Sequence, residues 1–127
     1  MAYTLAVLDS GASRPEVVPG AFECLCRDGG HGSVWVHVAG ELDLATSPLL
    51  ERTLRGAKLR SRQVVLDLRE LTFIDSCGVR VIVDASVRAR RVKRRVILVP
   101  GPPQVDRVLK LTGALEVLEI GGLHPVS

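Results

Sequence analysis

The chain has 127 residues, of which 46% are hydrophobic and 24% are charged, a balance typical of one ordinary globular domain. No apolar run reaches the roughly 18 residues that cross a bilayer, and residues 1–10 lack the basic residues that begin a secretory signal, so we expect a cytoplasmic protein. The modest net charge of +3 and the scarcity of aromatic residues argue against a protein that binds single-stranded nucleic acid by stacking its bases.

The chain is predicted to begin with an antiparallel pair of strands. Residues 1–20 contain two prolines and many small residues, and we interpret them as an N-terminal extension or one added edge strand. Strand-like runs follow at 21–26 and 33–38. The glycines between these runs favour a hairpin turn over residues 27–32.

Helices and buried strands alternate through the rest of the chain. Thr46 or Ser47 can cap a first helix, with Pro48 in its first turn. The apolar run at 63–68 is rich in β-branched residues, as expected of a central parallel strand covered on both faces. The remaining predicted elements are a helix over 76–92, a strand over 96–99, a helix over 104–111 that stops at Gly113, and a strand over 115–120.

This order of elements predicts an α/β fold. Repeated strand-helix-strand connections favour a mostly parallel sheet, and right-handed crossovers place consecutive helices on the same side of it. We therefore expect one domain over residues 21–120, with a mixed, mostly parallel sheet of about four or five strands and helices packed mainly on one side. Residues 121–127 are left as a C-terminal tail.

The segment from 65 to 79 carries the most informative chemistry. It contains a buried strand, the apolar pair Phe73 and Ile74, and then Asp75 and Ser76 at the start of a helix. There the Ser76 hydroxyl can cap free N–H groups of the first turn, and Asp75 lies near the positive end of the helix dipole. On local chemistry alone, a helix cap accounts for both side chains.

Residues 71–79, 38–46 and 105–113 each match a sequence motif of one known family. Together they resemble the STAS domain family, which includes the anti-sigma factor antagonists. Residues 71–79 (LTFIDSCGV) resemble the family signature in which the serine after the aspartate is phosphorylated by a partner kinase. Residues 38–46 (VAGELDLAT) are similar to the family's G-E-L-D motif, and residues 105–113 (VDRVLKLTG) resemble its late helix. The three matches occur in the family order and together cover about residues 21–120.

The resemblance implies a binding protein that is switched by phosphorylation at Ser76. The unmodified protein would bind an anti-sigma factor kinase and release a sigma factor, and phosphorylation by that kinase, which binds the ATP, would break the complex. A phosphate adds about −1.5 to −2 charges to the surface. The partner-binding residues implied are Asp43, Asp75, Ser76, Cys77 and Gly78, with both aspartates near the serine. For Asp43, a role as a loop or cap carboxylate stays open.

Two alternative classes of protein are an accessory subunit with the same fold and an enzyme. The same fold could be a STAS accessory subunit of a lipid-transport ATPase or of a stress-signalling complex, although the retained serine favours the antagonist. An enzyme is not expected, because the sequence contains neither GxxxxGK[ST] nor GxGxxG and no recognisable pair of nucleophile and base. We expect no cofactor, no metal and no direct contact with nucleic acid. A phosphatase as second partner, and a monomer or weak dimer, stay open.

Two departures from the family pattern concern cysteines and basic residues. Cys77 stands where relatives usually have serine or threonine, and both a small packing residue and a redox-sensitive thiol are compatible with it. Cys24 and Cys26 share one face of a strand, where core packing is expected rather than metal binding. Six basic residues crowd positions 88–95, and a solvated helix end, an acidic partner, a membrane surface or nucleic acid would each fit them.

Overall fold

A computed structural model describes residues 22–59 and 61–121 and confirms the predicted α/β order of strands and helices. The predictions for residues 1–20 and for the tail beyond residue 121 lie outside the described residues. The elements are β1 (Glu23–Gly30), β2 (Ser33–Leu42), α1 (Ser47–Leu59), β3 (Gln63–Ile74), α2 (Ser76–Arg91), β4 (Arg95–Val99), α3 (Pro103–Leu111), the 3₁₀ helix η1 (Ala114–Glu116) and β5 (Glu119–Ile120).

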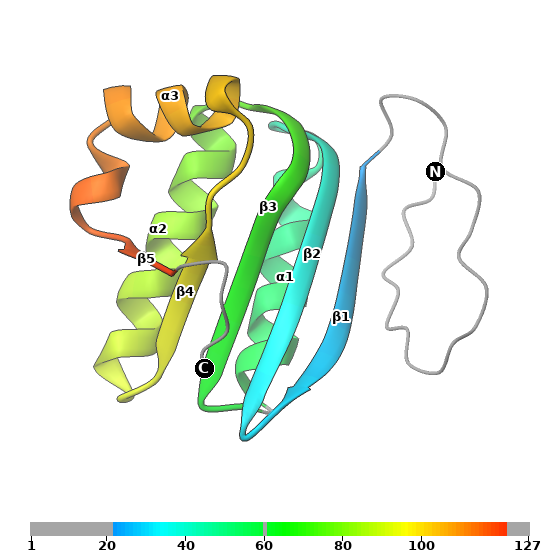
Figure 1. The fold of residues 1–127 in the computed structure, drawn as a ribbon, viewed down its shortest axis with the longest axis vertical. Coiled ribbons are helices and arrows are strands. Elements are labelled where there is room, and N and C mark those ends of the chain that lie inside the picture. Colours follow the sequence, from blue (N-terminus) through cyan, green and yellow to red (C-terminus); the bar gives the residue numbers. More distant parts are fainter. Residues whose placement is uncertain (1–21, 60, 122–127) are drawn as a thin grey trace.

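The five strands form one sheet in the order β1-β2-β3-β4-β5 (Figure 1). β1 and β2 form an antiparallel hairpin, whereas β2, β3, β4 and β5 are parallel to their neighbours. The central position of β3 agrees with its continuous apolar sequence, since a strand with neighbours on both edges and packing on both faces has few solvent-facing positions. The predicted mixed, mostly parallel sheet is therefore confirmed.

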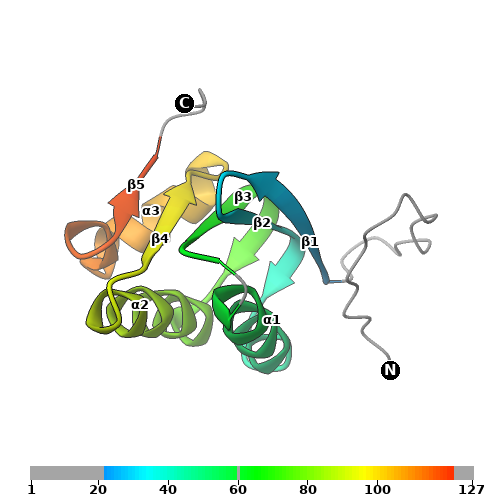
Figure 2. The same ribbon diagram turned by 90° about the horizontal axis from the view of Figure 1, so that it is seen from below.

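Helices α1 and α2 lie side by side against one face of the sheet, and α3 lies across the end at which β3 and β4 finish (Figures 1 and 2). The layer between sheet and helices is apolar. Alternate residues of the central strands point into it, among them Val36, Leu66 and Leu98, and Leu50 of α1 and Ile82 of α2 meet them there. Each such side chain contributes about 1.5–3 kcal/mol by leaving water.

The hairpin turn between β1 and β2 is shorter than the six residues predicted. β1 continues to Gly30 and β2 begins at Ser33, so that only His31 and Gly32 connect them. Gly30, His31 and Gly32 have φ values of 81°, 54° and 80°, which are left-handed conformations that permit a tight turn. The composition of residues 27–32 indicated a turn, but the strands extend into it because the glycines close the hairpin within two residues.

The strand predicted over 115–120 is wrong for most of its length. Gly113 ends α3 in a left-handed conformation, and residues 114–116 form η1 instead. Local bonds from Val117 N–H and Leu118 N–H to the Ala114 carbonyl satisfy the backbone without a neighbouring strand. Ala114 and Leu118 are both buried by this turn, and strand pairing is limited to Glu119–Ile120.

Helix α2 ends without a glycine at its C-terminus. Lys93 takes the left-handed conformation with φ of 62°. Its N–H donates to Arg90 O over 3.1 Å and the N–H of Arg94 donates to Ala89 O over 2.8 Å, which together form a Schellman motif. The helix end is therefore well defined, although a lysine occupies the left-handed position that glycine usually takes.

Candidate functional site

The candidate site lies where β2 and β3 end and their following helices begin. Leu42 and Ile74 form the last pair of the two strands, and Asp75 N–H donates to Leu42 O over 3.1 Å. This bond joins the loop that contains Asp43 to the loop that contains Asp75. The structure thus brings the two segments singled out in the sequence, which are about thirty residues apart, to one end of the sheet.

Asp43 orders the turn between β2 and α1. Its Oδ1 accepts hydrogen bonds from Ala45 N–H at 3.0 Å and Thr46 N–H at 3.1 Å, and its carbonyl accepts one from the Ser47 hydroxyl at 2.6 Å. The Thr46 hydroxyl in turn accepts from Asp43 N–H and lies 2.9 Å from Glu41 O. The turn-forming role left open for Asp43 is therefore present, and Oδ2 of Asp43 makes no hydrogen bond within the described residues.

The cap of α2 belongs to Asp75 rather than to Ser76. Asp75 has the extended backbone of an N-cap, with φ of −115° and ψ of −174°, and its Oδ1 accepts from Cys77 N–H at 2.9 Å and Gly78 N–H at 3.1 Å. Our expectation that the Ser76 hydroxyl caps the helix is wrong, because Ser76 is already the first helical residue. Its side chain is exposed, and within the described part of the chain its hydroxyl has no hydrogen-bond partner.

Cys77 and Gly78 continue the first turn of α2 toward the core. Cys77 is half-buried, whereas Gly78 is buried against the ends of both strands. A Cβ atom placed on Gly78 would lie 2.7 Å from Leu42 Cγ and 2.9 Å from Ile74 Cγ1. Gly78 therefore allows the close approach that brings the start of α2, and Ser76 with it, to the end of the sheet.

Asp67 is a functional candidate that the sequence analysis did not identify. Only 5% of it is exposed, and its carboxylate accepts hydrogen bonds from Arg69 Nε at 2.9 Å and Arg69 Nη2 at 2.8 Å, while Oδ2 lies 2.9 Å from His37 Nδ1. Burial opposes its ionisation, but the hydrogen bonds from His37 and Arg69 outweigh burial and hold the pKa of Asp67 well below its usual range. A single aspartate within the apolar run 63–68 was the signal in the sequence.

The Asp67 network lies where the pairing of β2 with β3 shifts. His37 pairs with Asp67 but Ala39 pairs with Glu70, so β3 contains one extra residue between these pairs. The Arg69 N–H donates to Asp67 Oδ1 over 3.0 Å and fixes this bulge. A second shift follows between Gly40 and Glu41. The two bulges set the position at which β3 ends, and hence the position of Asp75 and Ser76.

The cysteines and the acidic residues give no sign of a metal centre within the described residues, where no group of three or more His, Cys, Asp or Glu side chains is placed to hold an ion. Cys24 is fully buried, and burial raises the pKa of its thiol to about 12 although a hydrogen bond with Thr53 acts in the opposite direction. Cys24 is therefore a protonated core residue. In the same described ranges no helix has the length and apolarity to span a membrane.

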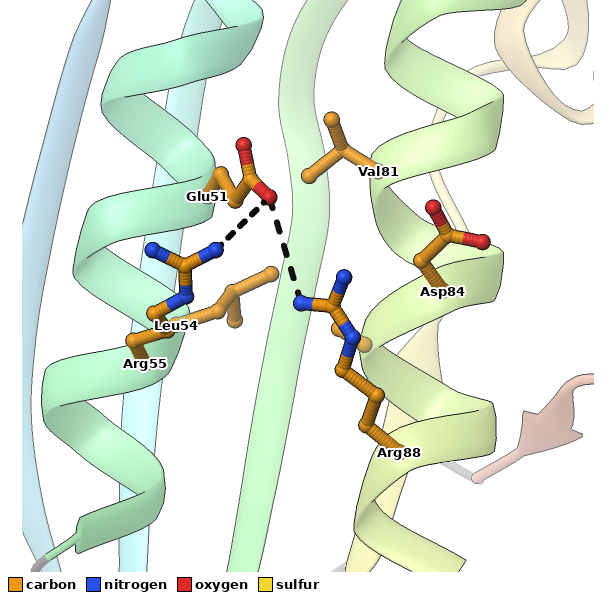
Figure 3. Close-up of a pocket in the computed structure, with 7 residues that line it drawn as sticks. Glu51, Leu54, Arg55, Val81, Asp84 and Arg88 are labelled. Atoms are coloured by element: carbon orange, nitrogen blue, oxygen red, sulfur yellow. Dashed lines mark hydrogen bonds and ion pairs between the residues drawn. The ribbon is translucent and has the colours of Figure 1, made fainter.

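A shallow pocket between α1 and α2 is separate from this site (Figure 3). Glu51 of α1 accepts a hydrogen bond from Arg55 over 3.1 Å and lies 3.9 Å from Arg88 of α2, so that the ion pair bridges the two helices. The space of about 220 Å³ includes open solvent. It is smaller than the roughly 300–1,000 Å³ of typical ligand sites, and we assign it to helix pairing.

Charge is unevenly distributed between the two ends of α2. Glu41 and Glu70 are exposed near the Ser76 end, where Asp43 and Asp75 are half-buried. The basic residues of positions 88–95 lie at or beyond the opposite end of the helix, which is about 24 Å away for 16 residues at 1.5 Å each. The surface around Ser76 therefore contains four carboxylates, although exposed Arg80 lies one helical turn after the serine and α3, across this end of the sheet, carries exposed Arg107 and Lys110. It is distant from the basic cluster of positions 88–95.

Comparison with known proteins gives consistent matches. A family model described as the STAS domain matches residues 27–124. The chain is 30% identical to the anti-sigma-B factor antagonist of Listeria monocytogenes over 95 residues. This aligned segment covers 74% of this chain and 82% of the Listeria protein.

Solved structures show the same fold. The crystal structure of an anti-sigma factor antagonist from Mycobacterium paratuberculosis has a TM-score of 0.69 at 23% identity and covers 83% of this chain and 89% of its own. The Bacillus cell fate determinant SpoIIAA, solved in its phosphorylated form, has a TM-score of 0.61 at 20% identity and covers 81% of this chain and 93% of its own. At these identities the likeness concerns the fold alone.

Proposed function

The chain belongs to the STAS domain family, and from this we propose that it is an anti-sigma factor antagonist: it binds an anti-sigma factor kinase while unmodified, thereby releases a sigma factor, and is switched off by phosphorylation at Ser76. One observation carries the proposal. The Ser76 hydroxyl is exposed at the start of α2 and uncommitted within the described residues, because Asp75 takes over the capping of the helix.

The position of Ser76 suits a phosphate acceptor. A kinase needs a serine hydroxyl that projects from the surface and has no competing bond, and a phosphate at the first helical residue is electrostatically favoured by the positive end of the helix dipole. Phosphorylation at this point would therefore leave α2 intact. This supports a switch that acts on the binding surface rather than through unfolding.

The charge around Ser76 supports the direction of the switch. Asp43 and Asp75 already place two carboxylates at the site, and Glu41 and Glu70 add two more on the neighbouring strands. A further −1.5 to −2 charges would have to be desolvated against a partner surface that fits the neutral hydroxyl. We infer that the phosphorylated protein dissociates because of this added charge.

The residues of the site support binding rather than catalysis in this chain. Within the described ranges, no base lies within hydrogen-bond reach of Ser76, and His37 contacts Asp67 on the sheet instead. ATP would be bound by the partner kinase. A phosphatase that removes the phosphate, and a cytoplasmic location for the whole cycle, complete the proposal.

The proposal is tested with purified protein and the anti-sigma factor kinase isolated with it from the native source. Incubation with ATP should add one phosphate, which peptide mass spectrometry should assign to Ser76. Ser76→Asp should bind the kinase at least tenfold more weakly than the isosteric control Ser76→Asn, because only the aspartate carries charge. Equal affinities of these two variants would contradict a charge-operated switch. If this chain, used as bait in the native extract, instead captured a transporter ATPase and stayed unphosphorylated, the accessory-subunit function would be supported.

A further inference from the structure

Two of the six exposed large apolar side chains among the described residues lie at the Ser76 end of the sheet. Leu44, one residue after Asp43, is 73% exposed, and Phe73, three residues before Ser76, is 47% exposed. A single exposed apolar residue is ordinary on a protein surface. Leu44 follows the end of β2, Phe73 is the next-to-last residue of β3, and a backbone bond from Asp75 N–H to Leu42 O joins these two strand ends. Two exposed apolar side chains at joined strand ends of a small domain indicate a contact surface.

Phe73 is turned outward by the second β-bulge. Leu71 is buried and pairs with Gly40, and the period of two would place Phe73 on the same buried side. Instead Thr72 is the extra residue of β3, its hydroxyl donates to Gly40 O over 3.0 Å, and Phe73 becomes the partner of Glu41. Bulges commonly redirect a side chain beside a functional site.

Leu44 is held at the tip of an ordered turn. Asp43 Oδ1 accepts hydrogen bonds from the N–H groups of Ala45 and Thr46, which fixes the backbone that follows Leu44. The backbone that precedes Leu44 is fixed by the end of β2. Little backbone freedom is left to lose when a partner covers the leucine. Such preorganisation lowers the entropic cost of binding.

The rim around these two side chains is acidic. Glu41 pairs with Phe73 across the ladder, Glu70 lies on the same strand as Phe73, and both glutamates are exposed. The half-exposed Arg69 before Glu70 is paired with Asp67 and does not offset them. An apolar centre with charged residues at its edge is the usual anatomy of a protein interface. A complementary partner would present an apolar pocket edged by Lys or Arg. A second copy of this chain that contacted this surface with the same surface would place Glu41 and Glu70 against their own counterparts, which is unfavourable.

We propose that Leu44 and Phe73 are the apolar anchors by which the unmodified protein binds the anti-sigma factor, whose docking surface is an apolar pocket with a basic rim. The inference rests on the proposed function and assigns affinity and switching to different residues of the same surface. The two anchors supply affinity, since aromatic and large aliphatic side chains at an interface centre carry most of its binding energy. Ser76 supplies the switch.

The test measures the affinity of the full chain for the anti-sigma factor kinase by calorimetry. Phe73→Ala should weaken binding at least about tenfold and Leu44→Ala at least about threefold, whereas Phe73→Leu should retain part of the affinity. Val92→Ala is the matched control, because Val92 is 60% exposed just beyond the opposite end of α2, and its affinity should change less than twofold. Leu44→Ala and Val92→Ala should keep the unfolding midpoint of the parent chain, since each alters a mostly exposed side chain. Phe73→Ala should lower the midpoint somewhat, because about half of that side chain is buried, and Phe73→Leu is the variant that keeps most of this packing.

The outcomes separate the two proposals. If the parent chain fails to bind the kinase, the proposed function is wrong. If the parent binds and both Phe73→Ala and Leu44→Ala, folded at the assay temperature, bind as tightly as the parent, the anchors are wrong and the function stands. A self-association of the parent chain that Phe73→Ala abolishes, without an effect on kinase binding, would assign the surface to a second copy and overturn the inference.

Discussion

Replacing Gly78 by alanine sets two well-characterised effects against each other. Glycine within a helix costs about 1 kcal/mol relative to alanine, so helix propensity alone predicts that Gly78→Ala stabilises the protein. The packing of α2 predicts the reverse. The added Cβ would lie 2.7 Å and 2.8 Å from Leu42 Cγ and Cδ2, and 2.9 Å from Ile74 Cγ1.

The packing effect should be the larger of the two. Leu42 is fully buried and Ile74 is 2% exposed, so neither side chain can move into solvent to make room. Overpacking of a buried site costs about 1–3 kcal/mol, and three contacts below 3 Å place Gly78→Ala at the upper end of that range. After the gain of about 1 kcal/mol in helix propensity, we expect a net loss of about 2 kcal/mol in the free energy of unfolding.

Urea unfolding followed by circular dichroism measures this difference. Gly56→Ala is the matched control, because Gly56 lies in α1 and a Cβ there would meet no atom within 4 Å. We expect the control to be more stable than the parent by about 0.5–1 kcal/mol, from helix propensity alone. If Gly78→Ala also proves as stable as the parent or more so, the close approach of α2 to the ends of β2 and β3 is wrong.

Three further predictions concern the ends of α2 and the Asp67 network. Lys93→Gly should stabilise the protein by about 1 kcal/mol in urea unfolding, because Lys93 has a φ of 62° that glycine adopts without strain; a loss of stability would contradict the helix end described. Asp67→Asn should lower the free energy of unfolding by about 2 kcal/mol at pH 7, a moderate value because Arg69 is half exposed. Because folding lowers the pKa of Asp67, its contribution to the free energy of unfolding is present above the unfolded pKa of about 3.9 and is lost as the pH falls below that value. The stabilities of parent and variant should therefore converge in acid. A difference in stability that persists at low pH would count against this. Ser76→Asp should leave the thermal midpoint unchanged or slightly raised, because a negative charge at the first helical residue complements the helix dipole; a lower midpoint would mean that the charge acts through unfolding.

Local patterns were sufficient to predict the main elements of the fold. The apolar run at 63–68 identified the central strand, because a strand with neighbours on both edges and packing on both faces has few polar positions. The start of α1 at Ser47 with Pro48 in its first turn was equally local. Both depend on interactions among residues a few positions apart, which a single sequence displays directly.

The assignment of the helix cap shows where local patterns become ambiguous. Asp75 and Ser76 are both good N-cap residues, and the sequence does not say at which of them the helix begins. The backbone bond from Asp75 N–H to Leu42 O holds Asp75 extended and so gives it the cap. Because Leu42 is more than thirty residues away, this decision depends on tertiary structure, and so does the freedom of the Ser76 hydroxyl.

The bulges of β3 were beyond local patterns for a related reason. Val36 pairs with Leu66 but Leu42 pairs with Ile74, so β3 contains two residues more than β2 over this stretch. Each shift adds one residue to β3, and two added residues restore the alternation of buried and exposed positions, so Ile74 faces the buried side as Leu66 does. A prediction from this alternation therefore does not reveal either bulge. Leu71 was the visible exception, since it is apolar and buried yet out of phase with Leu66.

These two extra residues also explain why the phosphate-acceptor candidate sits at the end of the sheet. With the register of Val36 and Leu66 continued unchanged, Leu42 would pair with Thr72, and Asp75 would fall three residues beyond the last pair. The bulges bring Ile74 level with Leu42 instead, so that Asp75 follows directly and its N–H reaches Leu42 O. Asp67 holds the first bulge through Arg69. Removing its charge should therefore disturb the loop of Ser76 as well as the stability of the sheet, although Asp67 lies nine residues earlier in the chain.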